Sequence, residues 1–166
     1  MASPQEGPHI LLRAFKLLRE RGIDVGLVMT GTAGTWVEAL ARRYGVGQGA
    51  RFLGRLPEGE YFRLMAGAGA TALPSVWPEP LPTVAVESVS LGVPVVGSGL
   101  GGFPEVVDRY GVVAPPLPEK IAEAMAKVLE IHYDREEMKR YAFGKFGIEN
   151  VEKLVEIFGR VLGRRD

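Results

Sequence analysis

The stretch at residues 74–87, PSVWPEPLPTVAVE, decides how this chain of 166 residues folds. It follows an apolar segment, ends in a helical pattern, and is succeeded by the apolar run GVPVV at 92–96. Pro82 stands where a helix should begin, because proline is well suited to the first turn of a helix. Glu79 precedes that helix and Glu87 lies a turn into it, with seven residues between the two. The stretch therefore predicts a loop and a helix between two strands, with a carboxylate on each side of the junction.

Short apolar runs alternate with helical patterns along the rest of the chain, which is typical of a parallel α/β sheet. Most runs are continuously apolar, as expected for strands that are covered on both faces. We expect strands at 25–30, 51–53, 70–73, 93–96 and 111–113, and helices at 10–21, 36–44, 58–68 and 83–91. Only helices are expected after 115–118, at 119–131, 135–146 and 148–162. The pattern predicts a single domain over residues 1–166, with Trp36 in its core.

The composition excludes several classes of function. The chain has no cysteine, which rules out disulfides, zinc–thiolate sites and a thiol nucleophile. Its 20 acidic and 20 basic residues argue against a nucleic-acid partner or a polybasic membrane patch. The apolar runs are far shorter than the ~20 residues that span a bilayer, and residues 1–6 do not read as a signal peptide. We therefore expect a cytoplasmic domain with no transmembrane segment.

Glycine-containing loops follow the expected strands. Ligands of open parallel sheets bind beyond the carboxyl ends of the strands, and glycine permits close approach of the backbone to a ligand. Gly31 opens the loop GTAG at 31–34, which is equally well a plain turn that joins a strand to a helix. Arg55 lies in GRL at 54–56 and either reaches a phosphate or is simply exposed.

The start of the helix at 83–91 is a candidate phosphate site, because free N–H groups and the dipole at a helix N-terminus attract anions. Pro82 has no N–H, so the amides of Leu81 and Thr83 are the expected donors. Glu87 could accept hydrogen bonds from the vicinal hydroxyls of a ribose, and Glu79 would lie near a sugar beyond the phosphates. The alternative is that Glu79 is a solvated loop charge and Glu87 a surface helix charge.

The segments PSVWPE, GVPVV and GGFPE (101–105) resemble the donor-binding C-terminal half of retaining glycosyltransferases of GT-B fold, family 4 or group 1. The resemblance implies a Rossmann-like, doubly wound parallel sheet flanked by helices. It implies that Glu79 is the catalytic residue that touches the donor sugar and that Glu87 binds the ribose. It also places Leu56 and its neighbours at the nucleobase pocket, and Gly101 and Gly102 near the donor sugar.

The activity that this resemblance implies is transfer of a hexosyl group from a nucleoside diphosphate (NDP) sugar to an acceptor hydroxyl, with configuration kept. The donor phosphate oxygen would take the proton, and no cofactor or metal is expected, since no cluster of Asp or His stands near the phosphate loop. The acceptor is read in this family by an N-terminal domain that these 166 residues do not contain. The base, the sugar and the acceptor stay open. A homo-oligomer is also open, because Leu154, Ile157, Phe158 and Val161 are candidates for an apolar contact.

The chain departs from the family at its start. The family's second domain opens with a strand that ends in Gly-Arg, followed by Lys-Gly, and these two cations neutralise the diphosphate. Here the arginine is absent and Glu6 stands where the lysine is expected. A departing nucleoside diphosphate needs its charge stabilised. The alternative is therefore a catalytically inactive, stand-alone nucleotide-binding or assembly module. A third hypothesis, a GT-B epimerase, requires further acidic and histidine residues that we do not find.

The absent strand is the central one in the doubly wound order 3-2-1-4-5-6. The strands expected at 25–30 and 70–73 must then pair directly, leave a gap, or recruit a strand from another copy. We predict direct pairing, because an unpaired and buried strand edge is costly.

Overall fold

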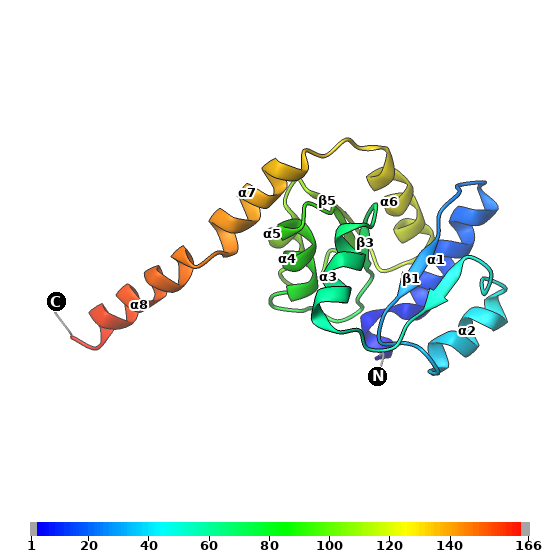
Figure 1. Ribbon diagram of the computed structural model, residues 1–166, viewed down its shortest axis with the longest axis horizontal. Coiled ribbons are helices and arrows are strands. Elements are labelled where there is room, and N and C mark those ends of the chain that lie inside the picture. The colour runs from blue at the N-terminus through cyan, green and yellow to red at the C-terminus, as the bar shows by residue number, and fades with distance from the viewer. Residues whose placement is uncertain (1–2, 164–166) are drawn as a thin grey trace.

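The computed structural model describes residues 3–163, in which short parallel strands alternate with helices (Figure 1). The strands are β1 (Leu27–Met29), β2 (Ala50–Phe52), β3 (Thr71–Leu73), β4 (Val95–Ser98) and β5 (Gly111–Ala114). The helices are η1 (Pro4–Glu6, a 3₁₀ turn), α1 (Pro8–Glu20), α2 (Trp36–Tyr44), α3 (Glu58–Ala66), α4 (Thr83–Ser90), α5 (Phe103–Val107), α6 (Pro118–Glu130), α7 (Arg135–Phe146) and α8 (Glu149–Val161). The α/β class with parallel strands is therefore confirmed.

Local signals place the ends of the helices. Thr35 caps α2 by accepting a hydrogen bond from the N–H of Val37, and Gly45 ends the helix with a left-handed φ of 72°. Asp134 caps α7 in the same way, through the N–H groups of Glu136 and Glu137. These two helices have the predicted bounds, and the other predicted elements begin and end within two residues of those found.

The strands form two separate sheets rather than one. In the described part of the chain, β1 pairs only with β2, while β3, β4 and β5 form a second sheet in that order. All pairs are parallel. The predicted direct pairing of the segments at 25–30 and 70–73 is therefore wrong. Instead, β1 and β3 line one cavity together with residues of α1 and α3, so helical side chains lie around the space between the two strands.

Helices cover both faces of the strands. Val95 and Val96 are neighbours on β4 and point to opposite faces, as successive strand residues must. Val96 packs with α1 and α6 residues such as Leu18 and Ile121. Val95 packs with α4, α5 and α7. A third cluster joins β1 to α1 and α2 around Phe15. α1 therefore contributes to the core clusters of both sheets.

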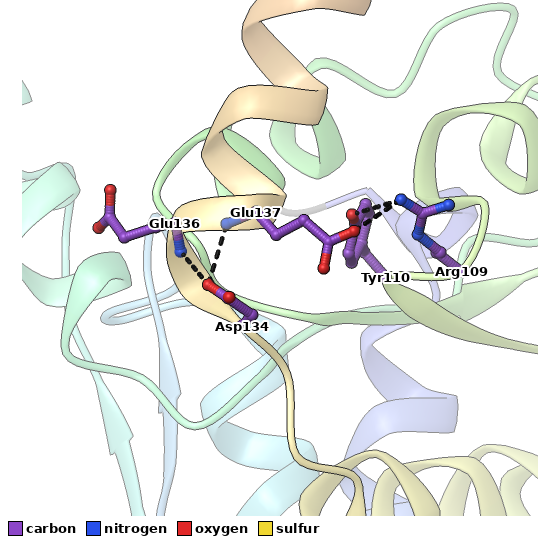
Figure 2. A network of polar contacts seen from close by, with 5 residues as sticks. All are labelled: Arg109, Tyr110, Asp134, Glu136 and Glu137. Carbon is purple, nitrogen blue, oxygen red and sulfur yellow. Dashed lines mark hydrogen bonds and ion pairs between the residues drawn. The ribbon is translucent and has the colours of Figure 1, made fainter.

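α7 is fastened to the loop between α5 and β5 by a polar network (Figure 2). One nitrogen of the Arg109 guanidinium donates a 2.7 Å hydrogen bond to Glu137 on α7 and a 3.0 Å one to the hydroxyl of Tyr110. Tyr110 also stacks on Tyr141 with a ring-centroid distance of 5.0 Å. These contacts fix α7 beside the second sheet.

The end of the chain leaves the body of the molecule. Figure 1 shows α7 and α8 as an arm that leads away from the sheets. No residue of α8 is buried, and its Leu154, Ile157, Phe158 and Val161 are all exposed. Trp36 is 38% exposed at the start of α2, so its predicted place in the core is wrong. Within residues 3–163, no helix has the length and apolarity that a membrane span needs.

Candidate functional site

A cavity of about 480 Å³ lies at the carboxyl ends of β1 and β3, where an open parallel sheet binds its ligands. The segments after these two strands supply much of its wall. Of the predicted site residues, Gly31, Glu79 and Pro82 line the cavity. Trp77, from the same loop as Glu79, lines it too and is otherwise exposed.

Glu79 is held in place through its backbone by the predicted glycine pair. The N–H of Gly102 donates a 2.8 Å hydrogen bond to the carbonyl of Glu79. Gly101 has a φ of +61°, and a Cβ there would overlap the backbone of Glu79. A Cβ at Gly102 would overlap the carbonyl of Pro80. Gly101 and Gly102 are not on the cavity wall themselves. Their role in this structure is to let two loops touch and so fix the position of Glu79.

The start of the chain closes one side of the cavity. The carbonyl of Gln5 accepts hydrogen bonds from the N–H of Val76 (2.8 Å) and the hydroxyl of Ser75 (3.1 Å). Gly7 has a φ of +73° and meets Pro74 so closely that a side chain there would overlap its carbonyl. Glu6 lines the cavity, and its carboxylate accepts a 3.1 Å hydrogen bond from the N–H of Ser3. Glu6, which stands where the family is expected to have a lysine, therefore lies on the wall of the candidate site.

The beginning of α4 also borders the cavity. Pro82 and Val84 lie on its wall, and no side chain caps the helix. Among the described residues, no acceptor meets the N–H groups of Leu81 and Thr83, which are both exposed. These amides remain free for an anion, although neither residue lines the cavity.

Glu87 does not reach the cavity wall but acts on it through Tyr61, a residue that sequence reasoning missed. The Tyr61 hydroxyl donates a 2.9 Å hydrogen bond to the carboxylate of Glu87. Burial, then this hydrogen bond and the negative charge of Glu87, raise the pKa of Tyr61. Tyr61 lines the cavity. The available signal was the apolar face of the helix predicted at 58–68, on which Tyr61 stands with a polar tip.

The loops predicted around the base lie close to one another. The N–H of Gly31 donates a 3.2 Å hydrogen bond to the carbonyl of Gly54, so Arg55 and Leu56 follow directly beside Gly31. Neither Arg55 nor Leu56 lines the cavity. Arg55 is exposed and forms no ion pair with any residue between Ser3 and Gly163.

The charges on the cavity wall are negative. Glu6 and Glu79 line it, and no lysine or arginine does so among the described residues. Ser98, at the end of β4, is buried on the wall with a hydroxyl that has no hydrogen-bond partner in the described structure. Buried polar groups usually find partners, so this hydroxyl is available to a ligand. Within residues 3–163, no three His, Asp or Glu side chains gather as a metal site would need.

The chain is similar to known proteins along most of its length. Its residues 2–145 match the family model described as glycosyl transferases group 1. It is 31% identical to D-inositol 3-phosphate glycosyltransferase of Corynebacterium urealyticum, over 92% of this chain and 40% of that protein. The chain thus spans about four-tenths of the length of the curated relatives it matches.

Solved structures show the same fold. A glycosyltransferase from Rickettsia africae superposes with a TM-score of 0.85 at 18% identity, over 99% of this chain and 46% of that one. Anabaena HepE, solved in complex with UDP, superposes with a TM-score of 0.81 at 24% identity, over 95% of this chain and 46% of that one. The fold is that of the GT-B glycosyltransferases. From the family match over residues 2–145, the chain belongs to the glycosyl transferases group 1 family.

Proposed function

We propose that the chain is the donor-binding half of a retaining glycosyltransferase, which in its full length transfers a hexosyl group from an NDP-sugar to an acceptor hydroxyl. The observation that carries the proposal is the position of Glu79. It lies on the wall of a cavity at the carboxyl ends of parallel strands, beside the start of α4, in a chain of this family. The complex of HepE with UDP supports a uridine or related nucleotide as the class of ligand.

Each predicted residue has a role in this proposal. Glu79 contacts the donor sugar and is the catalytic residue, held by Gly101 and Gly102. The amides of Leu81 and Thr83, on either side of Pro82, bind the diphosphate with help from the dipole of α4. Glu87 binds the ribose once the Tyr61 hydroxyl gives way to it.

The remaining predicted residues bind the base. The proton of the acceptor hydroxyl goes to the donor itself. Gly31 and the backbone at Arg55 and Leu56 bind the nucleobase, while the guanidinium of Arg55 is free to turn toward the phosphates. The donor phosphate oxygen takes the proton of the acceptor hydroxyl, and the reaction needs no metal. The acceptor would be bound by an N-terminal domain outside these 166 residues.

Calorimetric titration with UDP, GDP and ADP tests donor binding. We expect one nucleotide to bind with a 1:1 stoichiometry, and Glu87→Ala to weaken it by at least about tenfold, because a ribose diol loses its charged acceptor. Glu105→Ala is the matched control, since Glu105 is an exposed carboxylate of α5 that does not line the cavity. Absence of binding by all three nucleotides at millimolar concentration would contradict the proposal.

A second candidate is a catalytically inactive nucleotide-binding module of the same fold. It is favoured by Glu6, which puts a negative charge on a cavity wall that has no described lysine or arginine. Glu6→Lys should then raise nucleotide affinity several-fold, because it replaces repulsion of the diphosphate by attraction. Glu6→Gln should give a smaller gain, since it removes the charge only. Hydrolysis of the donor sugar by the unaltered chain, lost in Glu79→Ala, would contradict this second candidate.

A further inference from the structure

Trp77 is a large apolar side chain that stays uncovered on the wall of the candidate site. It is 55% exposed and stands two residues before Glu79. Within residues 3–163, its ring stacks on no other ring and no cation lies over it. Its indole N–H donates to no acceptor in the same part of the chain. The flat apolar face and the polar tip of the indole are therefore both available to a ligand.

The loop that carries Trp77 is held through its backbone on both sides of the indole. The N–H of Trp77 donates a 3.3 Å hydrogen bond to the hydroxyl of Ser75, which lies 3.2 Å from the carbonyl of Trp77. The N–H of Val76 is bonded to the carbonyl of Gln5 at 2.8 Å. On the other side, the backbone of Glu79 is fixed by the glycine pair described above. A ligand that packs on the indole thus meets a prepared surface, and little of the loop must be ordered on binding.

The charged groups around Trp77 indicate what kind of ligand this wall accepts. Glu6 and Glu79 line the same cavity, whereas no lysine or arginine does so among the residues that the structure describes. Carboxylates accept hydrogen bonds from hydroxyl groups and repel anions. The wall beside Trp77 is therefore better suited to a neutral group that carries several hydroxyls than to a phosphate.

A hexose in its ring form has both of the surfaces that this wall would bind. The C–H groups of the ring form an apolar patch, which gains free energy when it is buried against an aromatic face. The hydroxyls project from the edge of the ring and can donate to carboxylates, in charge-assisted hydrogen bonds that are stronger than neutral ones. An indole next to a carboxylate is thus a suitable arrangement for a sugar ring.

We propose that Trp77 is the platform on which the hexose ring of the donor stacks, while Glu79 binds hydroxyls at its edge. The inference rests on the proposed function, because it assumes that the cavity takes an NDP-sugar. A nucleobase on Trp77 is the alternative, since a flat base also stacks on an aromatic ring. The position of Trp77 favours the sugar. It shares a loop with Glu79, whereas the base is proposed to bind at Gly31 and Leu56.

Paired titrations separate the contribution of the hexose from that of the nucleotide. Calorimetry compares UDP with UDP-glucose, GDP with GDP-mannose, and ADP with ADP-glucose on the unaltered chain and on Trp77→Ala. For the pair that binds, Trp77→Ala should weaken the sugar conjugate at least about fivefold, because the ring loses its stacking partner. The affinity for the nucleotide alone should stay within about twofold, which is the range of an unrelated surface substitution.

Two further variants control for the shape of the loop. Trp77→Phe keeps a flat ring at the same position and should restore most of the affinity for the sugar conjugate. Val76→Ala is the matched control, because Val76 directly precedes Trp77, is 41% exposed and does not line the cavity. It keeps the N–H that is bonded to Gln5 and should change neither affinity. Circular dichroism checks that each variant is folded.

The fluorescence of the indole reports directly whether the sugar covers it. The chain has two tryptophans, so Trp36→Phe leaves Trp77 as the single emitter. Trp36 does not line the cavity. We expect the sugar conjugate to protect Trp77 from quenching by acrylamide and to shift its emission to shorter wavelength, because stacking removes the indole from water. The nucleotide alone should give neither effect.

The results that would overturn this inference differ from those that contradict the proposed function. If a nucleotide and its sugar conjugate bind but Trp77→Ala weakens neither, or Val76→Ala weakens the conjugate equally, the inference fails and the proposed function stands. Equal weakening of nucleotide and conjugate by Trp77→Ala would place the base on the indole and also overturn the inference. Absence of binding by all six ligands at millimolar concentration would contradict the proposed function and the inference together.

Discussion

The two sheets of this molecule differ in how well their central residues are enclosed. β4 has a strand on each edge and helices on each face, and all four of its residues are buried. β1 has the same kind of sequence but only one neighbouring strand, and its Val28 is half-exposed. The comparison shows that an apolar strand is buried by its neighbours rather than by its composition. The same substitution should therefore have different effects in the two sheets.

The largest difference is expected between two glycines. A Cβ at Gly97 in β4 would overlap the ring of Phe103 and approach the carbonyl of Leu73 at 2.8 Å. Gly97→Ala should reduce the free energy of unfolding by about 3 kcal/mol, because neither the ring nor the β3 backbone can move aside cheaply. Urea unfolding followed by circular dichroism measures this difference.

Gly26→Ala is the counterpart beside β1. Its Cβ would meet only the carbonyl of Gly49, at an ordinary 3.8 Å, and Gly26 does not have a positive φ. We expect a change between zero and about 1 kcal/mol in the stabilising direction, since alanine restricts the unfolded chain. Equal destabilisation by Gly97→Ala and Gly26→Ala would show that the two sheets are equally closely packed.

A second pair compares the mid-strand valines. Val96→Thr puts a hydroxyl into a fully buried position of β4 and should cost about 2 kcal/mol. Val28→Thr makes the same change at a position that water reaches, and should stay within about 0.5 kcal/mol. The midpoints of urea unfolding give both values. A loss of about 2 kcal/mol at Val28 would mean that its side chain is enclosed in solution.

The sequence predicted the helices and strands well because their signals are local. Thr35 and Gly45 mark the two ends of α2, and Asp134 marks the start of α7. The pairing of the strands is not local, and this is where prediction failed. Whether β1 and β3 meet depends on how α1 and α6 pack beneath both, which no single segment encodes. The cost of unpaired edges was expected to bring β1 and β3 together, but both edges stay open in residues 3–163.

The candidate site was predicted only in part. Gly31, Glu79 and Pro82 line the cavity because loops after parallel strands converge at one edge of a sheet. Tyr61 was missed because its contact with Glu87 joins residues 26 positions apart. Trp36 was placed in the core on the strength of its apolar side chain, yet it lies at the first position of α2, where the helix is still open to solvent.

Ser88 tests how β3 is held on its paired side. Its buried hydroxyl lies 2.8 Å from the hydroxyl of Thr71 on β3 and 2.9 Å from the carbonyl of Val93. Ser88→Ala should cost about 1–2 kcal/mol, because it leaves buried polar groups without a partner. Thermal unfolding measures the loss. Ser90→Ala, at the exposed end of the same helix, is the control and should change the stability little. An equal loss in Ser90→Ala would show that the effect comes from α4 itself and not from the buried hydrogen bonds of Ser88.

A small effect is also expected at Tyr61, which lines the cavity of the candidate site. At pH 8, Tyr61→Phe should cost less than about 1 kcal/mol, because its hydrogen bond to Glu87 is only partly buried. The pH dependence of the free energy of unfolding is a more specific test of the Tyr61 hydroxyl. The pKa of Tyr61 is raised in the folded chain above its usual 10.0, mainly by burial and then by Glu87. The folded state therefore keeps a proton that the unfolded state loses, and stability should fall as the pH rises above 10.

Unfolding in urea at intervals from pH 8 to pH 11 reveals this dependence as a slope. Tyr61→Phe should flatten the slope above pH 10, since phenylalanine has no proton to lose. Glu87→Gln keeps an acceptor for the hydroxyl but removes the charge, so it should flatten the slope less. Identical slopes for all three chains would mean that Tyr61 is solvated in the folded state.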